Sequence, residues 1–190
     1  MDALDALINR VSAPRLIEPA PSAEQRERLF KAALRAPDHG QLRPWRFLTV
    51  EGDARHALGE LYAEAIASKN PQADEEALTK ARNMPLRAPL MIVVIARIQE
   101  HPKVPAQEQV LAAGCAAHGI LLAAYAQGIG AVWRTGELSH DPVVDAGLGL
   151  AANEQVIGYL YLGTPQRELR DAPAVNVDEF VSGWKGKAQG

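Results

Sequence analysis

Two continuous apolar runs stand out in the chain and predict the strands at its centre. Residues 90–96 (Leu-Met-Ile-Val-Val-Ile-Ala) and 156–162 (Val-Ile-Gly-Tyr-Leu-Tyr-Leu) contain no charged side chain. Runs of this length and composition are typical of strands that are covered on both faces. Two further strands are predicted at residues 46–51 and in the segment that follows Gly128-Ile-Gly130, as far as Thr135.

Apolar residues at helical spacing predict helices before and between these strands. Ser22 and Gln25 have the spacing of a capping box. Pro37 should end the helix that they begin, because the residue before a proline is driven out of helical geometry. Asp53 is expected to be the N-cap of the next helix. The predicted helices cover residues 2–10, 23–36, 54–69, 74–84 and 105–127, with a short one after Asp141-Pro142.

The helix predicted at 105–127 is apolar on nearly its whole circumference. Such a helix is expected to be buried on every side, and a second subunit would make this easier in a chain of 190 residues. Cys115 lies in it among Ala and Gly residues, so a buried and unreactive thiol is expected. Strands with helices before and between them indicate an α+β fold built on a single sheet.

Composition narrows the range of functions. The length corresponds to one domain, and a net charge of −3 provides no electrostatic basis for binding nucleic acid or an anionic membrane. Arg outnumbers Lys by 14 to 6, which favours an anionic ligand, although GC-rich coding would produce the same excess. The single cysteine rules out an intrachain disulfide or a CxxC pair. The acidic N-terminus and the lack of a long uninterrupted apolar span predict a cytoplasmic protein.

The last part of the chain is polar but carries isolated large apolar residues. Phe180, Val181 and Trp184 are expected to dock on another surface, and a partner subunit is the candidate. We therefore divide the chain into a domain at 1–165 and a C-terminal arm at 166–190.

The common motifs of nucleophilic, metal and phosphate-loop chemistry are absent. The sequence has no GxSxG, HExxH or P-loop motif, and its histidines lack metal-ligand spacing, so we expect no metal and no catalytic side chain. Asp38 and His39 are adjacent in a proline-flanked turn and are not expected to form a dyad. Gly128 and Gly130 follow a helix and precede a strand, the reverse of a dinucleotide fingerprint, so they are expected to cap the helix.

Three segments carry unusual side chains for their predicted location. Residues 10–15 hold two arginines and a serine, which suit a phosphate but would equally compensate a helix dipole and form a turn. Residues 35–47 form a cationic, aromatic loop, which either binds a ligand or only connects a helix to a strand. Trp133-Arg134-Thr135 ends a strand, either at a ligand-binding sheet edge or at a solvated terminus.

The order of these blocks resembles the nitroreductase family. Arg-x-Ser-x-x-Arg near the N-terminus is followed by Arg-Ala-Pro-Asp-His, then by Gly-Ile-Gly-Ala-Val-Trp-Arg-Thr-Gly and by Gly-Tyr-Leu-Tyr-Leu-Gly-Thr-Pro. The resemblance covers nearly the whole chain and is closest to a short subgroup of NAD(P)H nitroreductases. It implies a nitroreductase-like α+β fold: a central, mostly antiparallel sheet of four to five strands flanked by helices. It also implies an intertwined homodimer with FMN at the subunit interface.

The resemblance also implies where FMN is held. The phosphate or ribityl oxygens would be held by Arg10, Val11 and Ser12. The same cofactor would be lined by Trp133, Arg134 and Thr135. The partner subunit would contribute Arg35 and His39, which would contact the flavin end of the cofactor. The family usually has a basic residue where this chain has Val11, so a weaker phosphate contact is expected if that side chain takes part.

The nicotinamide nucleotide would meet a segment at the end of the long helix. This segment comprises Ala123, Ala124, Tyr125, Ala126, Gln127 and Gly128.

These expectations describe an FMN-dependent enzyme that takes electrons from NADH or NADPH. Its acceptors would be nitro compounds, quinones or similar electron-poor molecules, reduced in a ping-pong cycle. No protein nucleophile is needed, because N5 of the flavin accepts and delivers the hydride. Charge developing at flavin N1–O2 must be stabilised, and the sequence leaves open whether Arg10, Arg15, Arg35 or a main-chain donor does so. Two alternatives stay open: a reductase of free flavin, and a non-catalytic flavin-binding or storage dimer.

Overall fold

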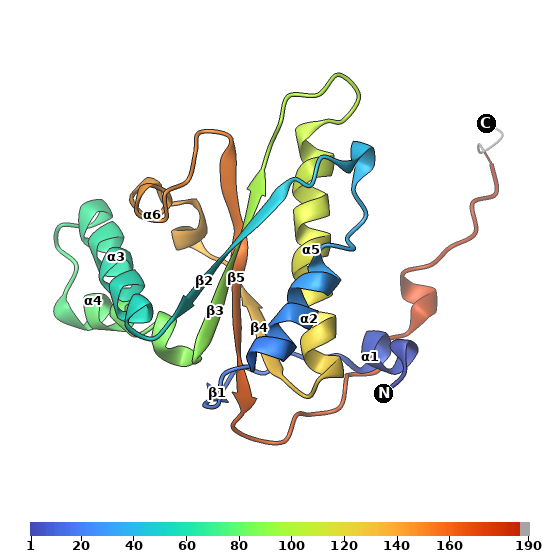
Figure 1. Ribbon diagram of the computed structural model, residues 1–190, viewed down its shortest axis with the longest axis horizontal. Coiled ribbons are helices and arrows are strands. Elements are labelled where there is room, and N and C mark those ends of the chain that lie inside the picture. The colour runs from blue at the N-terminus through green and yellow to red at the C-terminus, as the bar shows by residue number, and fades with distance from the viewer. Residues whose placement is uncertain (187–190) are drawn as a thin grey trace.

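The computed structural model describes residues 1–186 and contains one antiparallel sheet with helices on both faces (Figure 1). β5 pairs with β3 along most of its length, β2 extends the sheet beyond β3, and β4 and β1 also pair with β5. This is the predicted α+β fold. β1 was not predicted, because two residues between prolines give no hydrophobic pattern. The strands are β1 (Leu16–Ile17), β2 (Trp45–Glu51), β3 (Leu90–Arg97), β4 (Gly130–Arg134) and β5 (Glu154–Pro165).

The predicted helices are all present, with small differences at their ends. The Ser22–Gln25 capping box forms, but α2 ends at Ala33 and the chain continues to Ala36 in tighter turns. Gly52, with a φ of 55°, is the N-cap of α3 in place of Asp53. The helices are α1 (Ala3–Asn9), α2 (Ala23–Ala33), α3 (Asp53–Lys69), α4 (Glu75–Arg82), α5 (Ala106–Ala126) and α6 (Pro142–Gly147). Short 3₁₀ turns are η1 (His39–Gln41), η2 (Pro85–Arg87), η3 (Glu137–His140) and η4 (Val177–Glu179).

The two faces of the sheet carry separate apolar cores. Alternate residues of β3 point to opposite faces, and the strand is buried from Leu90 to Ala96, as its continuous apolar run predicted. One core lies between the sheet and α2 with α5, and the other between the sheet and α3 with α4 and α6 (Figure 1).

One face of α5 is exposed, so the prediction of a helix buried on every side is wrong for the single chain. Ala113, Ala116 and Ile120 are fully buried, whereas Leu111 is 60% exposed. Cys115 is also exposed, and the expectation of a buried thiol is wrong, because no element of residues 1–186 covers this face. By length and a mean hydropathy of 1.5, α5 would suit a membrane span, but it packs on the sheet and α2 as a core helix.

Apolar side chains are exposed on α1 and on the C-terminal arm as well. Leu4, Leu7 and Ile8 share a face of α1, as predicted, but that face is exposed. Beyond β5 the chain extends away from the domain (Figure 1), and Trp184 is 88% exposed. Residues 187–190 of the predicted arm lie outside the described residues. Docking of the arm on a partner stays a prediction.

Candidate functional site

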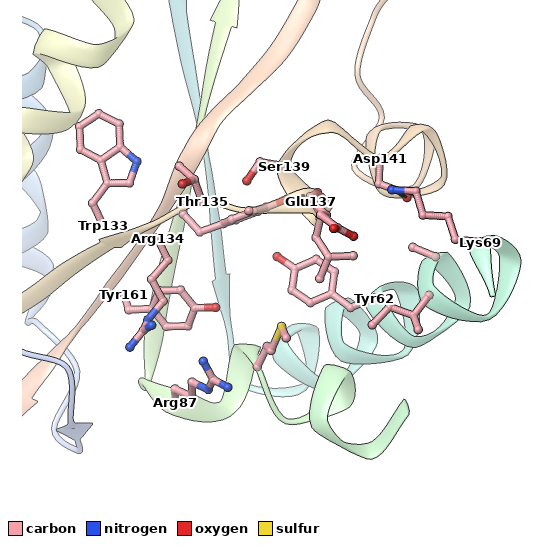
Figure 2. Close-up of a pocket in the computed structure, with 16 residues that line it drawn as sticks. Tyr62, Lys69, Arg87, Trp133, Arg134, Thr135, Glu137, Ser139, Asp141 and Tyr161 are labelled. Carbon is pink, nitrogen blue, oxygen red and sulfur yellow. Dashed lines mark hydrogen bonds and ion pairs between the residues drawn. The ribbon is translucent and has the colours of Figure 1, made fainter. Parts of the chain in front are cut away.

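A cavity of about 480 Å³ lies beside the end of β4 (Figure 2). Tyrosine side chains come from the neighbouring strand and from α3, and the Tyr62 and Tyr159 rings meet edge-on with 5.8 Å between their centroids. Arg134 and Thr135 line the cavity from the end of β4, and Arg87 lines it from η2. The cavity therefore combines aromatic surface with cations, and the carboxylates of Glu137 and Asp141 also line it.

Several polar groups in this cavity have no partner within residues 1–186. Arg134 Nε and Ser139 Oγ are buried without a hydrogen bond, which is unusual for buried polar atoms and points to a ligand. The Arg134 guanidinium lies 5.8 Å from the centre of the Tyr161 ring, within cation–π range. Burial raises the pKa of Tyr161, and the Arg87 and Arg134 guanidiniums partly oppose that increase. Burial also raises the pKa of Tyr159 to about 12, so its hydroxyl is neutral and donates to the Leu138 carbonyl.

A second hollow, the Ser12 groove, lies between the residues after α1 and those after β5. It is lined by Val11–Arg15 and Arg167–Arg170, with a volume of about 420 Å³. The Gln166 N–H donates to the Arg15 carbonyl at 3.1 Å and holds the two segments together. Arg15, Arg167 and Arg170 have no salt bridge in the described part of the chain. The lining holds three arginines, one glutamate (Glu168) and a serine, and this excess of positive charge suits a phosphate.

The Ser12 groove and the cavity lie along the same strand. The Ala13 N–H donates to the Ala131 carbonyl at 2.9 Å, so the segment that contains Arg10 and Ser12 runs beside the start of β4. From Ala131 to Arg134 the strand advances about 10 Å towards the cavity. The structure thus brings the first and third of the predicted segments together.

Trp133 borders the cavity, but its indole points away from the labelled side chains there (Figure 2). A Cβ at Gly158 of β5 would lie 2.1 Å from Trp133 Nε1, and a Cβ at Gly114 of α5 would lie 3.9 Å from Cη2. The indole therefore packs between the sheet and α5. Of the three residues predicted to lie along the cofactor, Arg134 and Thr135 line the cavity most directly.

His39 lies at the opposite end of α5 from α1. His39 Nδ1 is 2.6 Å from Glu108 Oε2, at the start of α5. Tyr125, near the other end of α5, shares a shallow hollow with α1. Seventeen residues of helix separate Glu108 from Tyr125, which is about 25 Å. Within one chain, His39 therefore does not meet Arg10 and Ser12. Arg35 follows Ala33, which packs against Gly119 of α5, and it lines neither the cavity nor the Ser12 groove.

The remaining features of the 35–47 segment are structural. Asp38 accepts hydrogen bonds from the Leu42 and Arg43 N–H groups and does not pair with His39, as expected. Trp45 is buried in the core beside α2 and α5. Arg46 is hydrogen-bonded to Glu154 through two nitrogens.

The segment predicted to meet the nicotinamide nucleotide closes α5 and lines neither the cavity nor the Ser12 groove. Ala124 is fully buried, and the Gln127 amide donates to the Ala123 carbonyl at 3.0 Å. Gly128 has a φ of 72° and ends the helix, as the glycine spacing predicted. Tyr125 is half-buried and Ala126 is exposed.

Comparisons with known proteins identify the family. The model of the nitroreductase family matches residues 17–164. YdjA of Escherichia coli (strain K12), provisionally named an NAD(P)H nitroreductase, is 46% identical over 180 residues, which are 94% of this chain and 96% of YdjA. This chain belongs to the nitroreductase family.

Solved structures agree with the nitroreductase fold. A nitroreductase-like family protein from Bacillus cereus superposes with a TM-score of 0.82 at 22% identity, covering 98% of this chain and 97% of that one. A protein from Desulfovibrio desulfuricans, provisionally described as a nitroreductase and solved in complex with FMN, gives a TM-score of 0.72 at 23% identity. That match covers 96% of this chain and 97% of the other. At these identities the likeness establishes the fold alone.

Sequence reasoning missed several residues of this nitroreductase's two hollows. Arg167 and Arg170 reach the Ser12 groove because the end of β5 pairs with β1, which immediately follows Arg15. Arg87 and Tyr62 reach the cavity from η2 and α3. No local pattern marks these positions, since each depends on how the strands are ordered. Val11 lines the groove without a charge, in a place where Arg167 and Arg170 supply cations.

Proposed function

We propose that this nitroreductase is an FMN-dependent NAD(P)H oxidoreductase that reduces nitro compounds, quinones or similar electron-poor acceptors in a ping-pong cycle. The name of the relative YdjA supports the nicotinamide reductant. The FMN complex of the Desulfovibrio protein supports the cofactor. In the net reaction, NAD(P)H, a proton and the acceptor give NAD(P)⁺ and an acceptor that has gained two electrons and two protons.

The observation that carries this proposal is the hydrogen bond from Ala13 N–H to the Ala131 carbonyl. It places a phosphate-type groove and an aromatic, cationic cavity along one strand. FMN has the matching form: an anionic phosphate at one end, a polar ribityl chain and a planar ring at the other. The buried and unpartnered Arg134 Nε would donate a hydrogen bond to a polar group of such a ring.

The residues present fit FMN, and each has a distinct task. Ser12, Arg10, Arg15 and the arginines after β5 would hold the phosphate. The tyrosines would exclude water from one side of the ring, and Arg134 would hold it from the end of β4. When bound, FMN supplies the redox chemistry, since N5 of its ring accepts and delivers a hydride.

We further infer a two-fold homodimer in which α5 packs against its copy. Leu111, Cys115 and His118 are exposed at spacings of four and three residues, which is the pattern of a helix seam. If the paired α5 helices are antiparallel, the end of α5 beside His39 in one subunit lies at the α1 end of the other. The partner subunit would then supply His39, and Arg35 from the segment before it, to the FMN site. The exposed arm would cover apolar surface of the same partner.

The experiment that tests the function uses the purified full chain loaded with FMN. The protein should be yellow, and NADH or NADPH added without oxygen should bleach the flavin absorbance. Reoxidation by a nitro compound or a quinone should then restore the absorbance. A yellow protein that neither nucleotide reduces would indicate a storage dimer. Turnover only with added free flavin would indicate a flavin reductase, and a chain that takes up no FMN would contradict the cofactor assignment.

The site assignment has its own test with a matched control. Arg10→Ala and Ser12→Ala should each weaken FMN binding about fivefold, because each removes an exposed contact worth about 1 kcal/mol. Arg97→Gln removes an exposed arginine at the opposite end of β3 from η2, so its FMN affinity should equal that of the wild type. Unchanged affinity in both groove variants would show that this segment is only structural.

The dimer is tested by light scattering at micromolar concentration, where a monomeric mass would contradict it. Leu111→Asp places a charge on the exposed face of α5 and should yield a monomer of normal secondary structure. Because the partner supplies Arg35 and His39 in this proposal, the monomer should also bind FMN more weakly.

A further inference from the structure

We propose that Arg87 places its guanidinium against the N1–O2 edge of the flavin and thereby favours the reduced cofactor. This inference rests on the proposed function, because it assumes that FMN binds with its ring in the cavity. It answers which cation neutralises the charge that develops at N1–O2, a role for which the sequence offered only Arg10, Arg15, Arg35 or a main-chain donor.

Arg87 is held at the cavity by local structure. It is the last residue of η2, directly before the short connection into β3, and its N–H is bonded to the Met84 carbonyl. Figure 2 shows its side chain directed towards the Tyr161 ring, which Arg134 approaches from β4. Both guanidiniums lower the pKa of Tyr161, in agreement with this placement.

Within residues 1–186, Arg87 has no salt bridge and donates no side-chain hydrogen bond. The third cation of the cavity, Lys69, is paired with Asp141 at 3.3 Å. The Asp141 carboxylate also accepts hydrogen bonds from the N–H groups at the start of α6. Its partners are therefore Lys69 and the helix N-terminus. A free cation in an aromatic cavity is well suited to meet an anion.

Arg87 fits this role better than the other arginines. Arg134 is less mobile, because its Nε is buried and its guanidinium lies against the Tyr161 ring. Arg10 and Arg15 lie at or beside the Ser12 groove, where the phosphate is proposed to bind, and Arg35 does not line the cavity. Arg87 is exposed enough to adjust its position to a bound ring.

A guanidinium in this position would stabilise reduced FMN more than oxidised FMN. The oxidised ring is neutral at N1–O2, whereas reduction places negative charge there, so the attraction develops as the ring is reduced. Removal of Arg87 should therefore lower the affinity for reduced FMN and leave that for oxidised FMN nearly unchanged.

The test measures the midpoint potential of the FMN-loaded full chain by dye equilibration, and the dissociation constant of oxidised FMN by fluorescence. Arg87→Gln should reduce the preference for reduced over oxidised FMN about tenfold, which shifts the two-electron potential about 30 mV more negative. Arg87→Lys should keep a potential close to that of the wild type, since the positive charge is retained. Arg97→Gln, at the other end of β3, should have the wild-type potential.

The outcomes separate the role of Arg87 from the proposed function on which that role rests. A wild-type protein that holds FMN, together with an Arg87→Gln variant of unchanged potential, would overturn the role of Arg87 and leave the proposed function standing. A wild-type protein that takes up no FMN would overturn both. Equal shifts in Arg87→Gln and Arg97→Gln would indicate a general effect of net charge and would also overturn the specific role.

Discussion

Replacement of Gly158 by alanine tests how the sheet positions Trp133 beside the proposed site. The new Cβ would lie 2.1 Å from Trp133 Nε1 and 2.8 Å from Cδ1. Carbon atoms in contact need about 3.5–4.0 Å, so the indole or the strand must move by more than 1 Å. The indole is rigid and has α5 on its far side, where Gly114 is the near neighbour. Overpacking of this kind costs about 1–3 kcal/mol, and the φ of 156° at Gly158 adds backbone strain, because alanine rarely adopts it.

The shift should affect the site as well as the stability, because Trp133 is followed directly by Arg134 and Thr135, which line the cavity. We expect Gly158→Ala to lower the urea midpoint, change the tryptophan fluorescence and weaken FMN binding. Gly114→Ala is the matched control at the same indole: its Cβ would make an ordinary contact of 3.9 Å in a helix. It should therefore stabilise the protein by about 0.5–1 kcal/mol. Wild-type stability and FMN affinity in Gly158→Ala would refute this account of the packing.

Three further predictions concern stability and charge. The hydrogen bonds from Arg46 lower the pKa of Glu154 to about 2, so Glu154→Gln should cost about 3 kcal/mol at neutral pH. Because that pKa is lowered, the difference from wild type in urea unfolding should be complete above pH 4.5 and shrink as the pH falls towards 2; a constant difference would contradict the ion-pair account. Arg170→Gln should weaken FMN binding and reduce its dependence on salt, as measured by titration at several salt concentrations, and an unchanged salt slope would remove Arg170 from the phosphate site. Gly59→Ala would place a Cβ 2.3 Å from the Arg82 carbonyl oxygen, so it should force α3 and α4 apart and lower the thermal midpoint, and an unchanged midpoint would contradict that contact.

The elements of this fold were predictable where the pattern along the chain is local. The apolar runs at 90–96 and 156–162 gave β3 and β5, and the Ser22–Gln25 capping box marked the start of α2. β1 was missed because its pairing partner, residues 164–165, lies nearly 150 positions away in the chain. The exposed face of α5 was not predicted for a related reason. Apolar residues on every side of a helix indicate that it is buried, but they do not indicate whether the same chain or another molecule covers it.

The candidate site shows the same division between local and distant information. Arg10, Ser12, Arg134 and Thr135 stood out locally, whereas their common location follows from a single backbone hydrogen bond between Ala13 and Ala131. Arg87, Arg167 and Arg170 follow or precede strands without any unusual neighbours in the sequence. They become parts of a site only because β5 is paired with β1, β3 and β4 at once.

The position of Arg35 and His39 extends this reasoning beyond one chain. His39 lies about 25 Å from α1, measured along α5 from Glu108 to Tyr125, which is too long for any side chain to span. A two-fold axis across the middle of α5 would exchange its two ends, and would bring His39 of one copy to the cofactor site of the other. The exposed Leu111 and Cys115 lie on the face that such an axis would bury. The same apolar surface that the single chain leaves uncovered would then complete the cofactor site, so loss of the dimer and loss of FMN binding should occur together.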